Sequence, residues 1–207
     1  MLISLYISAP FRKMIAHPTV VQRLNMMLGP GYFEAFEPMA CNYIPGTCGG
    51  SLHAGPMLEG GLSGTATGYG LAHGRAYCGG VNVQWALGDA TAAEGGCFVC
   101  IPGGHKARYP YPGGQSSTTA IDGRSVKHIS VYAGDVCIFI ASGVPHGVVK
   151  WDERNSSERR CVIQFNSSRN SAVTPGQALG TALRNHADPA HADSGGPVRS
   201  EKTMILY

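Results

Sequence analysis

The sequence predicts a mostly β fold, a double-stranded β-helix (jelly roll) with a short N-terminal helix. Two observations favour it. Short apolar stretches rich in β-branched and aromatic residues recur about every 10–15 residues from residue 81 onward, with turn-forming residues between them. Glycine and proline number 29 and 13 of 207 residues, which favours short elements joined by tight turns. Hydrophobic residues make up 43% of the chain, so a buried core is expected.

One helix is predicted, over residues 11–28. Its apolar residues follow helical spacing from Val20 to Leu28, and Pro18 occupies a position that tolerates proline early in a helix. The Gly29-Pro30 pair ends the pattern.

The strongest strand pattern covers residues 81–87. Side chains alternate between a polar face with Asn82 and Gln84 and an apolar face with Val83 and Trp85. Further strands are predicted at residues 97–101, 128–131, 136–141, 147–150 and 161–165.

The chain is expected to form one domain over residues 1–166, N-terminally shortened relative to the family named below. Residues 167–207 form a polar, flexible C-terminal tail in this prediction.

The net charge is only +3 and basic residues are scattered, so no nucleic-acid partner is expected. No apolar run reaches about 20 residues, which argues against a membrane span. Seven cysteines without a regular spacing indicate buried thiols in a reducing compartment, so a cytoplasmic location is expected.

Two of the eight histidines lie where a metal site between two sheets would need them. His53 follows a glycine-rich turn, and His146 lies at the end of the predicted strand 136–141. A facial iron site uses two imidazoles and one carboxylate and keeps open positions for substrate and oxygen. Imidazoles distant in sequence can meet when two sheets pack face to face.

Three segments occur in an order and spacing that resemble the phytanoyl-CoA dioxygenase family of Fe(II)- and 2-oxoglutarate-dependent oxygenases. Residues 81–106 read VNVQWALGDATAAEGGCFVCIPGGHK, residues 131–147 read VYAGDVCIFIASGVPHG, and residues 158–165 read ERRCVIQF. The resemblance covers roughly residues 40–166. It implies an enzyme that uses Fe(II), 2-oxoglutarate and O2 to hydroxylate a small organic substrate.

The resemblance also implies roles for individual residues. His53 and His146 would be the metal ligands. Arg159 would hold the distal carboxylate of 2-oxoglutarate, with Arg160 as the competing register, because a guanidinium binds a carboxylate through two parallel hydrogen bonds. For Asn82 and Gln84 two alternatives remain. They contact the oxoacid or the substrate from the inner face of the sheet, or they form a polar outer face.

The family's proximal motif is His-x-Asp, whereas this chain has His53-Ala54-Gly55. Three interpretations follow. Another carboxylate, such as Glu59, supplies the third ligand. Water replaces it, giving a weak or inactive site and a jelly-roll binding module. Or the vacancy admits chloride, as in related 2-oxoglutarate-dependent halogenases with Gly or Ala at this place. Hydroxylation is the leading hypothesis, and the halogenase and the inactive module are its alternatives.

Overall fold

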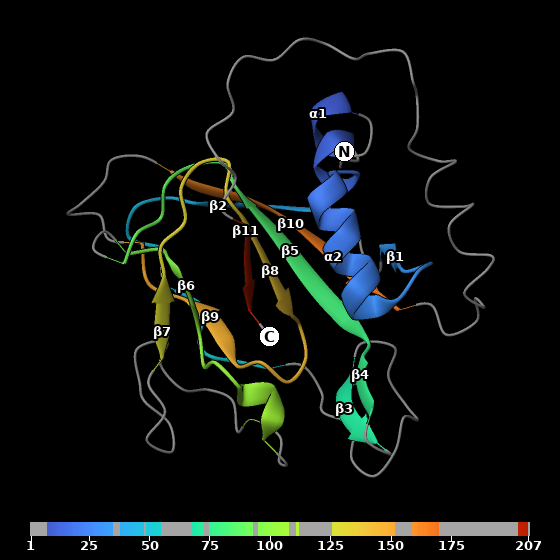
Figure 1. Ribbon diagram of the computed structural model, residues 1–207. Helices are drawn as coiled ribbons and strands as arrows, with labels where there is room; N and C mark the ends of the chain where they lie inside the picture. Colours follow the sequence, from blue (N-terminus) through green and yellow to red (C-terminus); the bar gives the residue numbers. More distant parts are fainter. Residues whose placement is uncertain are drawn as a thin grey trace.

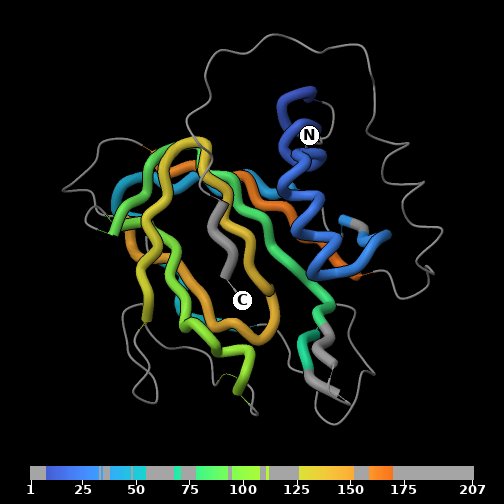
Figure 2. The backbone as a smooth tube through the Cα atoms, in the orientation of Figure 1, coloured from blue at the N-terminus to red at the C-terminus, as the bar shows by residue number. Residues whose placement is uncertain are grey.

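The computed structural model shows two main sheets, a separate two-stranded hairpin, and a helical segment that packs on the larger sheet (Figure 1). The residues that it describes are 8–34, 38–47, 49–54, 68–72, 75–92, 95–107, 111, 126–151, 159–169 and 203–206. Figure 2 traces the same path and shows the helical segment passing across the strands of the larger sheet.

The helical segment consists of two helices, α1 (Ala9–Ile15) and α2 (Pro18–Leu28), where the sequence predicts one. His17 lies between them in an extended conformation, with ψ of 126°. The physical reason is Pro18, whose ring disfavours helical backbone at the residue before it. Proline therefore begins the second helix and interrupts the first.

The larger sheet contains six strands in the order β1-β10-β5-β8-β11, with β2 also paired to β10. Every pair is antiparallel except β11 with β8. The strands are β1 (Phe33–Glu34), β2 (Met39–Tyr43), β5 (Gly80–Ala86), β8 (Val136–Ile140), β10 (Arg160–Ser168) and β11 (Thr203–Leu206).

The smaller sheet has the order β7-β6-β9, and a separate hairpin precedes β5. The rings of Phe98 and Phe139 connect the two sheets, with centroids 4.6 Å apart. The smaller elements are β3 (Tyr69–Ala72), β4 (Arg75–Cys78), β6 (Phe98–Cys100), η2 (Gly104–Lys106), β7 (Lys127–Ile129) and β9 (His146–Val148). The strands predicted after residue 80 are thus confirmed to within a few residues.

The larger sheet has an outer face, toward α2, and an inner face, toward the smaller sheet. Val83 and Trp85 of β5 belong to the same buried cluster as Leu24 of α2, and the ring of His17 lies 5.5 Å from that of Trp85. Asn82 pairs in register with Phe139, whose ring contacts the smaller sheet, so Asn82 is on the inner face.

The C-terminal region contributes two strand segments to the larger sheet. β10 continues to Ser168, beyond the predicted boundary at residue 166, and β11 pairs with β8 near the end of the chain. Residues 170–202 of the predicted tail lie outside the described residues. The polar composition of residues 166–168 explains why the sequence pattern placed the end of the strand too early.

No helix among the described residues is long and apolar enough to cross a membrane.

Candidate metal centre

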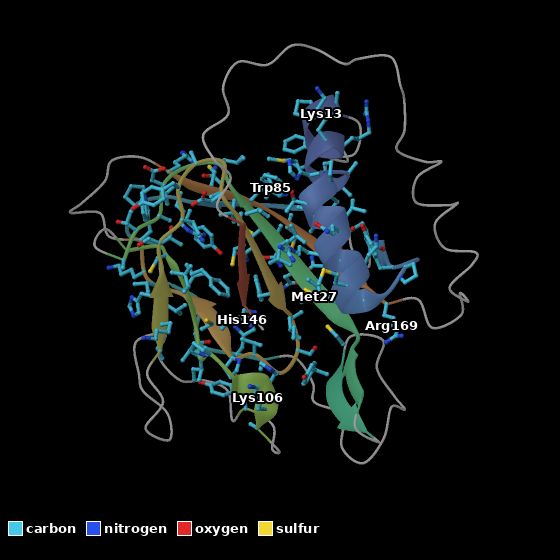
Figure 3. All side chains as sticks on the ribbon, in the orientation of Figure 1. Lys13, Met27, Trp85, Lys106, His146 and Arg169 are labelled. Atoms are coloured by element: carbon cyan, nitrogen blue, oxygen red, sulfur yellow. The ribbon has the colours of Figure 1, made fainter. Side chains whose placement is uncertain are left out.

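His53 and His146 meet across an antiparallel backbone bridge. The N–H of each residue donates to the carbonyl oxygen of the other, at 2.9 Å in both directions. Directly opposed residues of an antiparallel pair project to the same side, so the backbone brings the two imidazoles together. Their ring centroids lie 4.4 Å apart with an interplanar angle of 56°. Figure 3 labels His146 between the two sheets.

Both imidazoles are held by a backbone carbonyl two residues earlier. Nδ1 of His146 lies 2.7 Å from the carbonyl oxygen of Val144, and Nδ1 of His53 lies 2.9 Å from that of Ser51. A carbonyl oxygen only accepts, so each Nδ1 must carry the hydrogen and donate it. The lone pair of each neutral ring is then on Nε2, the atom available to a metal.

The two histidines differ in environment. His53 is exposed, whereas His146 is buried and lies against Phe139 and Phe98, with centroid distances of 4.7 and 5.9 Å. Burial lowers the pKa of His146 to about 4; the bond to Val144 opposes this shift, and the neighbouring His53 adds to it. At neutral pH His146 is therefore the uncharged imidazole that binds metals.

A third protein ligand is not found among the described residues, in which no group of three His, Cys, Asp or Glu side chains could hold a metal ion. Gly55 and Glu59, which bear on the three interpretations above, lie outside the described residues. Within that part of the chain, the site consists of two imidazoles.

The two arginines at the start of β10 have different environments. Arg159 is exposed, whereas Arg160 is 2% exposed. Within the described structure, Nε and Nη1 of Arg160 are buried without a hydrogen-bond partner, and its guanidinium lies 5.0 Å from the centroid of the Tyr43 ring. Burial lowers the pKa of Arg160, opposed chiefly by Tyr43, but a guanidinium stays charged in proteins. Of the two arginines, Arg160 is the buried cation, and no anion binds its guanidinium among the residues that the structure describes.

Gly96 makes room for the Arg160 side chain. A Cβ at this position would lie 2.9 Å from Cδ of Arg160 and 2.4 Å from the ring of Trp151, and Gly96 has a φ of +64°. We expect Gly96→Ala to destabilise the protein by about 2–4 kcal/mol, through overpacking and left-handed strain together. Chemical denaturation measures the loss.

Gly134→Ala is the matched control for that substitution. Gly134 also has a positive φ, +92°, but nothing lies within 4 Å of a Cβ there. It should lose only about 1–2 kcal/mol, from strain alone. Equal losses in the two variants would show that Gly96 does not accommodate Arg160 and Trp151.

The structure places Asn82 and Gln84 on the inner face, one of the two alternatives left open by the sequence. Gln84 donates from Nε2 to Oε1 of Gln164 at 2.6 Å, and Gln164 donates in turn to Oδ1 of Asn166 at 3.1 Å. Sequence reasoning missed Gln164 and Asn166. The signal was available, because both share the period-two face of Arg160 along β10.

Other residues near the two histidines support the backbone around the site. Asp89 accepts a hydrogen bond from the N–H of Ala133 at 2.8 Å, which ties two turns together. Gly104 packs against Pro145, the residue before His146: a Cβ at Gly104 would lie 2.2 Å from the proline ring. His105 is buried beside Tyr69, with ring centroids 5.4 Å apart.

Cys97, directly before β6, and Cys100, its last residue, belong to different buried clusters. Positions three apart along an extended chain point to opposite sides, so these two thiols do not face one common site.

Comparison with solved structures shows that the chain shares its fold with several of them. The chain superposes on HygX from Streptomyces hygroscopicus with nickel and 2-oxoglutarate bound, with a TM-score of 0.61 and 18% identity over 80% of this chain and 69% of that one. HygX with iron bound gives 0.61 and 17%, over 80% and 70%.

A third similar structure is SnoN, described as a non-heme alpha ketoglutarate dependent epimerase from nogalamycin biosynthesis. It gives a TM-score of 0.54 and 16% identity over 97% of this chain and 74% of that one. No family model matches the chain, and no curated protein sequence does. At these identities the comparisons establish the shared fold.

Proposed function

We propose that this protein is an Fe(II)- and 2-oxoglutarate-dependent dioxygenase that hydroxylates a small organic substrate with O2. The observation that carries the proposal is the imidazole pair. A backbone carbonyl binds Nδ1 of each ring, which leaves both Nε2 lone pairs available to one ion. The fold supports it: the two-sheet arrangement is the one expected of a double-stranded β-helix, and HygX, which shares it, binds iron and 2-oxoglutarate.

The described residues fit both cofactors. His53 and His146 would hold the iron, since a neutral imidazole suits Fe(II). Arg160 would hold the distal carboxylate of 2-oxoglutarate, because its buried Nε and Nη1 have no other partner within the described structure. This assignment replaces Arg159, whose side chain is exposed.

The cofactors, when bound, supply the oxygen-activating chemistry. The chain's residues bind and orient them. The carbonyls of Val144 and Ser51 keep the imidazoles in one tautomer. The rings of Phe98 and Phe139 cover His146 on one side and keep water from it.

The first test is an anaerobic titration of the purified protein with Fe(II) and then 2-oxoglutarate, followed by visible absorption. We expect a metal-to-ligand charge-transfer band that saturates with 2-oxoglutarate. Folded protein that binds neither component would contradict the proposal and favour a binding module without catalysis.

A halogenase is the second candidate, favoured by the His53-Ala54-Gly55 sequence and by the lack of a carboxylate ligand among the described residues. An anion such as chloride would then complete the coordination. Repeating the titration with and without chloride separates the two reactions. A chloride-dependent shift of the band supports the halogenase, whereas an unchanged band supports the hydroxylase.

A further inference from the structure

The inner face of the larger sheet carries a row of amide side chains beside the metal centre. Asn82 pairs in register with Asn166, and Gln84 with Gln164, so all four project to the same side. Asn82 also pairs with Phe139, whose ring lies 4.7 Å from that of His146. The amide row therefore begins next to the proposed iron ligand.

Three of the four amides remain partly open to solvent although they lie on interior strands, whereas Asn82 is buried. β5 is flanked by β10 and β8, and its outer face is covered by α2, so Gln84 can be accessible only from the inner side. Gln84, Gln164 and Asn166 are all partly buried rather than buried. A core that only needed filling would use apolar side chains here.

The hydrogen bonds among the amides leave groups for a ligand. Gln84 uses Nε2 as a donor to Gln164, and Gln164 uses Nε2 as a donor to Asn166. Each amide has two donor hydrogens and an acceptor oxygen, so donors and acceptors remain on the row. The two bonds fix the orientation of the central Gln164, which gives the row a defined pattern before a ligand arrives.

The charged side chains on the inner face limit which kinds of substrate group can bind there. At the described inner-face positions of β2, β5, β8 and β10 there is no carboxylate, and Arg160 is the one permanently charged side chain. In the proposed function Arg160 is engaged by 2-oxoglutarate. A charged group on the substrate would find no counter-ion there and would lose hydration without compensation.

We infer that the row of Asn82, Gln84, Gln164 and Asn166 recognises a neutral, hydroxyl-rich part of the substrate, of the polyol or sugar type. Hydroxyl groups both donate and accept, as the amides do. This inference rests on the proposed function, because it places the row beside a catalytic iron.

The test uses a matched set of six-membered-ring probes and saturation-transfer NMR on protein loaded with Ni(II) and 2-oxoglutarate. The probes are inositol and methyl glucoside (neutral), glucose 6-phosphate (anionic), glucosamine (cationic) and cyclohexanol (largely apolar). We expect the two neutral polyols to bind best.

The double variant Gln84→Leu with Gln164→Leu should weaken the binding of these polyols about tenfold, since it removes two or more hydrogen bonds. Gln22→Leu, on the exposed side of α2, should change nothing.

A second variant covers the case in which the double variant fails to fold. Gln84→Glu keeps the side-chain size and adds a negative charge to the row, so it should shift the preference toward glucosamine. Best binding of the anionic or apolar probe, no binding of the neutral probes, or an unchanged preference in both variants would overturn the inference. Calorimetry of 2-oxoglutarate binding separates the outcomes: binding without polyol selection refutes this inference alone, and no binding refutes the proposed function as well.

Discussion

His146→Gln is expected to abolish the charge-transfer band of the Fe(II)–2-oxoglutarate complex and to weaken metal binding by at least about 100-fold. The imidazole is the buried ligand, with its lone pair fixed on Nε2 by the carbonyl of Val144. Losing even an outer partner of a metal ligand typically costs 10–100-fold in affinity, so losing the ligand itself costs more. Glutamine is chosen because it keeps much of the side-chain volume against Phe98 and Phe139.

The control for this prediction is His128→Gln. His128 is an exposed histidine of β7 whose Nδ1 lies 3.8 Å from Sγ of Cys97. Metal titration and thermal melting of both variants separate a lost ligand from a lost fold. A folded His146→Gln protein that binds Fe(II) as tightly as the parent would show that the metal centre is assigned to the wrong residues.

Arg160→Met is expected to weaken 2-oxoglutarate binding by about 30-fold or more. Removing one partner of a buried, hydrogen-bonded charge pair costs about 2–5 kcal/mol. Arg159→Met is the matched control: it removes the same side chain one residue earlier, where it is exposed, and should change affinity less than about threefold. Calorimetric titration of the metal-loaded protein measures both. The reverse order of effects would return the carboxylate anchor to Arg159.

In the protein without cofactors, Arg160→Met is expected to maintain or increase stability, although it weakens 2-oxoglutarate binding. Arg160 holds a buried charge whose Nε and Nη1 lack partners within the described structure, which costs free energy while no anion is bound. Replacing it with the apolar Met should leave the free energy of unfolding unchanged or raise it by about 1–4 kcal/mol. Denaturation of the metal-free variant checks this. Marked destabilisation would mean that Arg160 serves the fold rather than a ligand.

The strands after residue 80 could be predicted because each has a local signal. β5 alternates polar and apolar side chains, and β8 is an uninterrupted apolar run between turns. β2, β3 and β4 fall in a glycine-rich region without a clear period, so no local pattern there distinguishes strand from loop. β11 follows a long polar segment and pairs with β8 in parallel. This contact joins residues far apart in the sequence, so a local pattern does not predict it.

The sequence by itself determined the two-faced character of β5, and it predicted His53 and His146 as metal ligands and Arg159 or Arg160 as the carboxylate anchor. Tertiary structure decided three further points. It brought the histidines together, because a backbone bridge joins residues 53 and 146. It distinguished Arg160 from Arg159, because Arg160 begins β10 and is buried, whereas Arg159, the residue before the strand, is exposed. It also turned Asn82 and Gln84 inward, because α2 covers the apolar face of β5 and leaves the polar face toward the candidate metal centre.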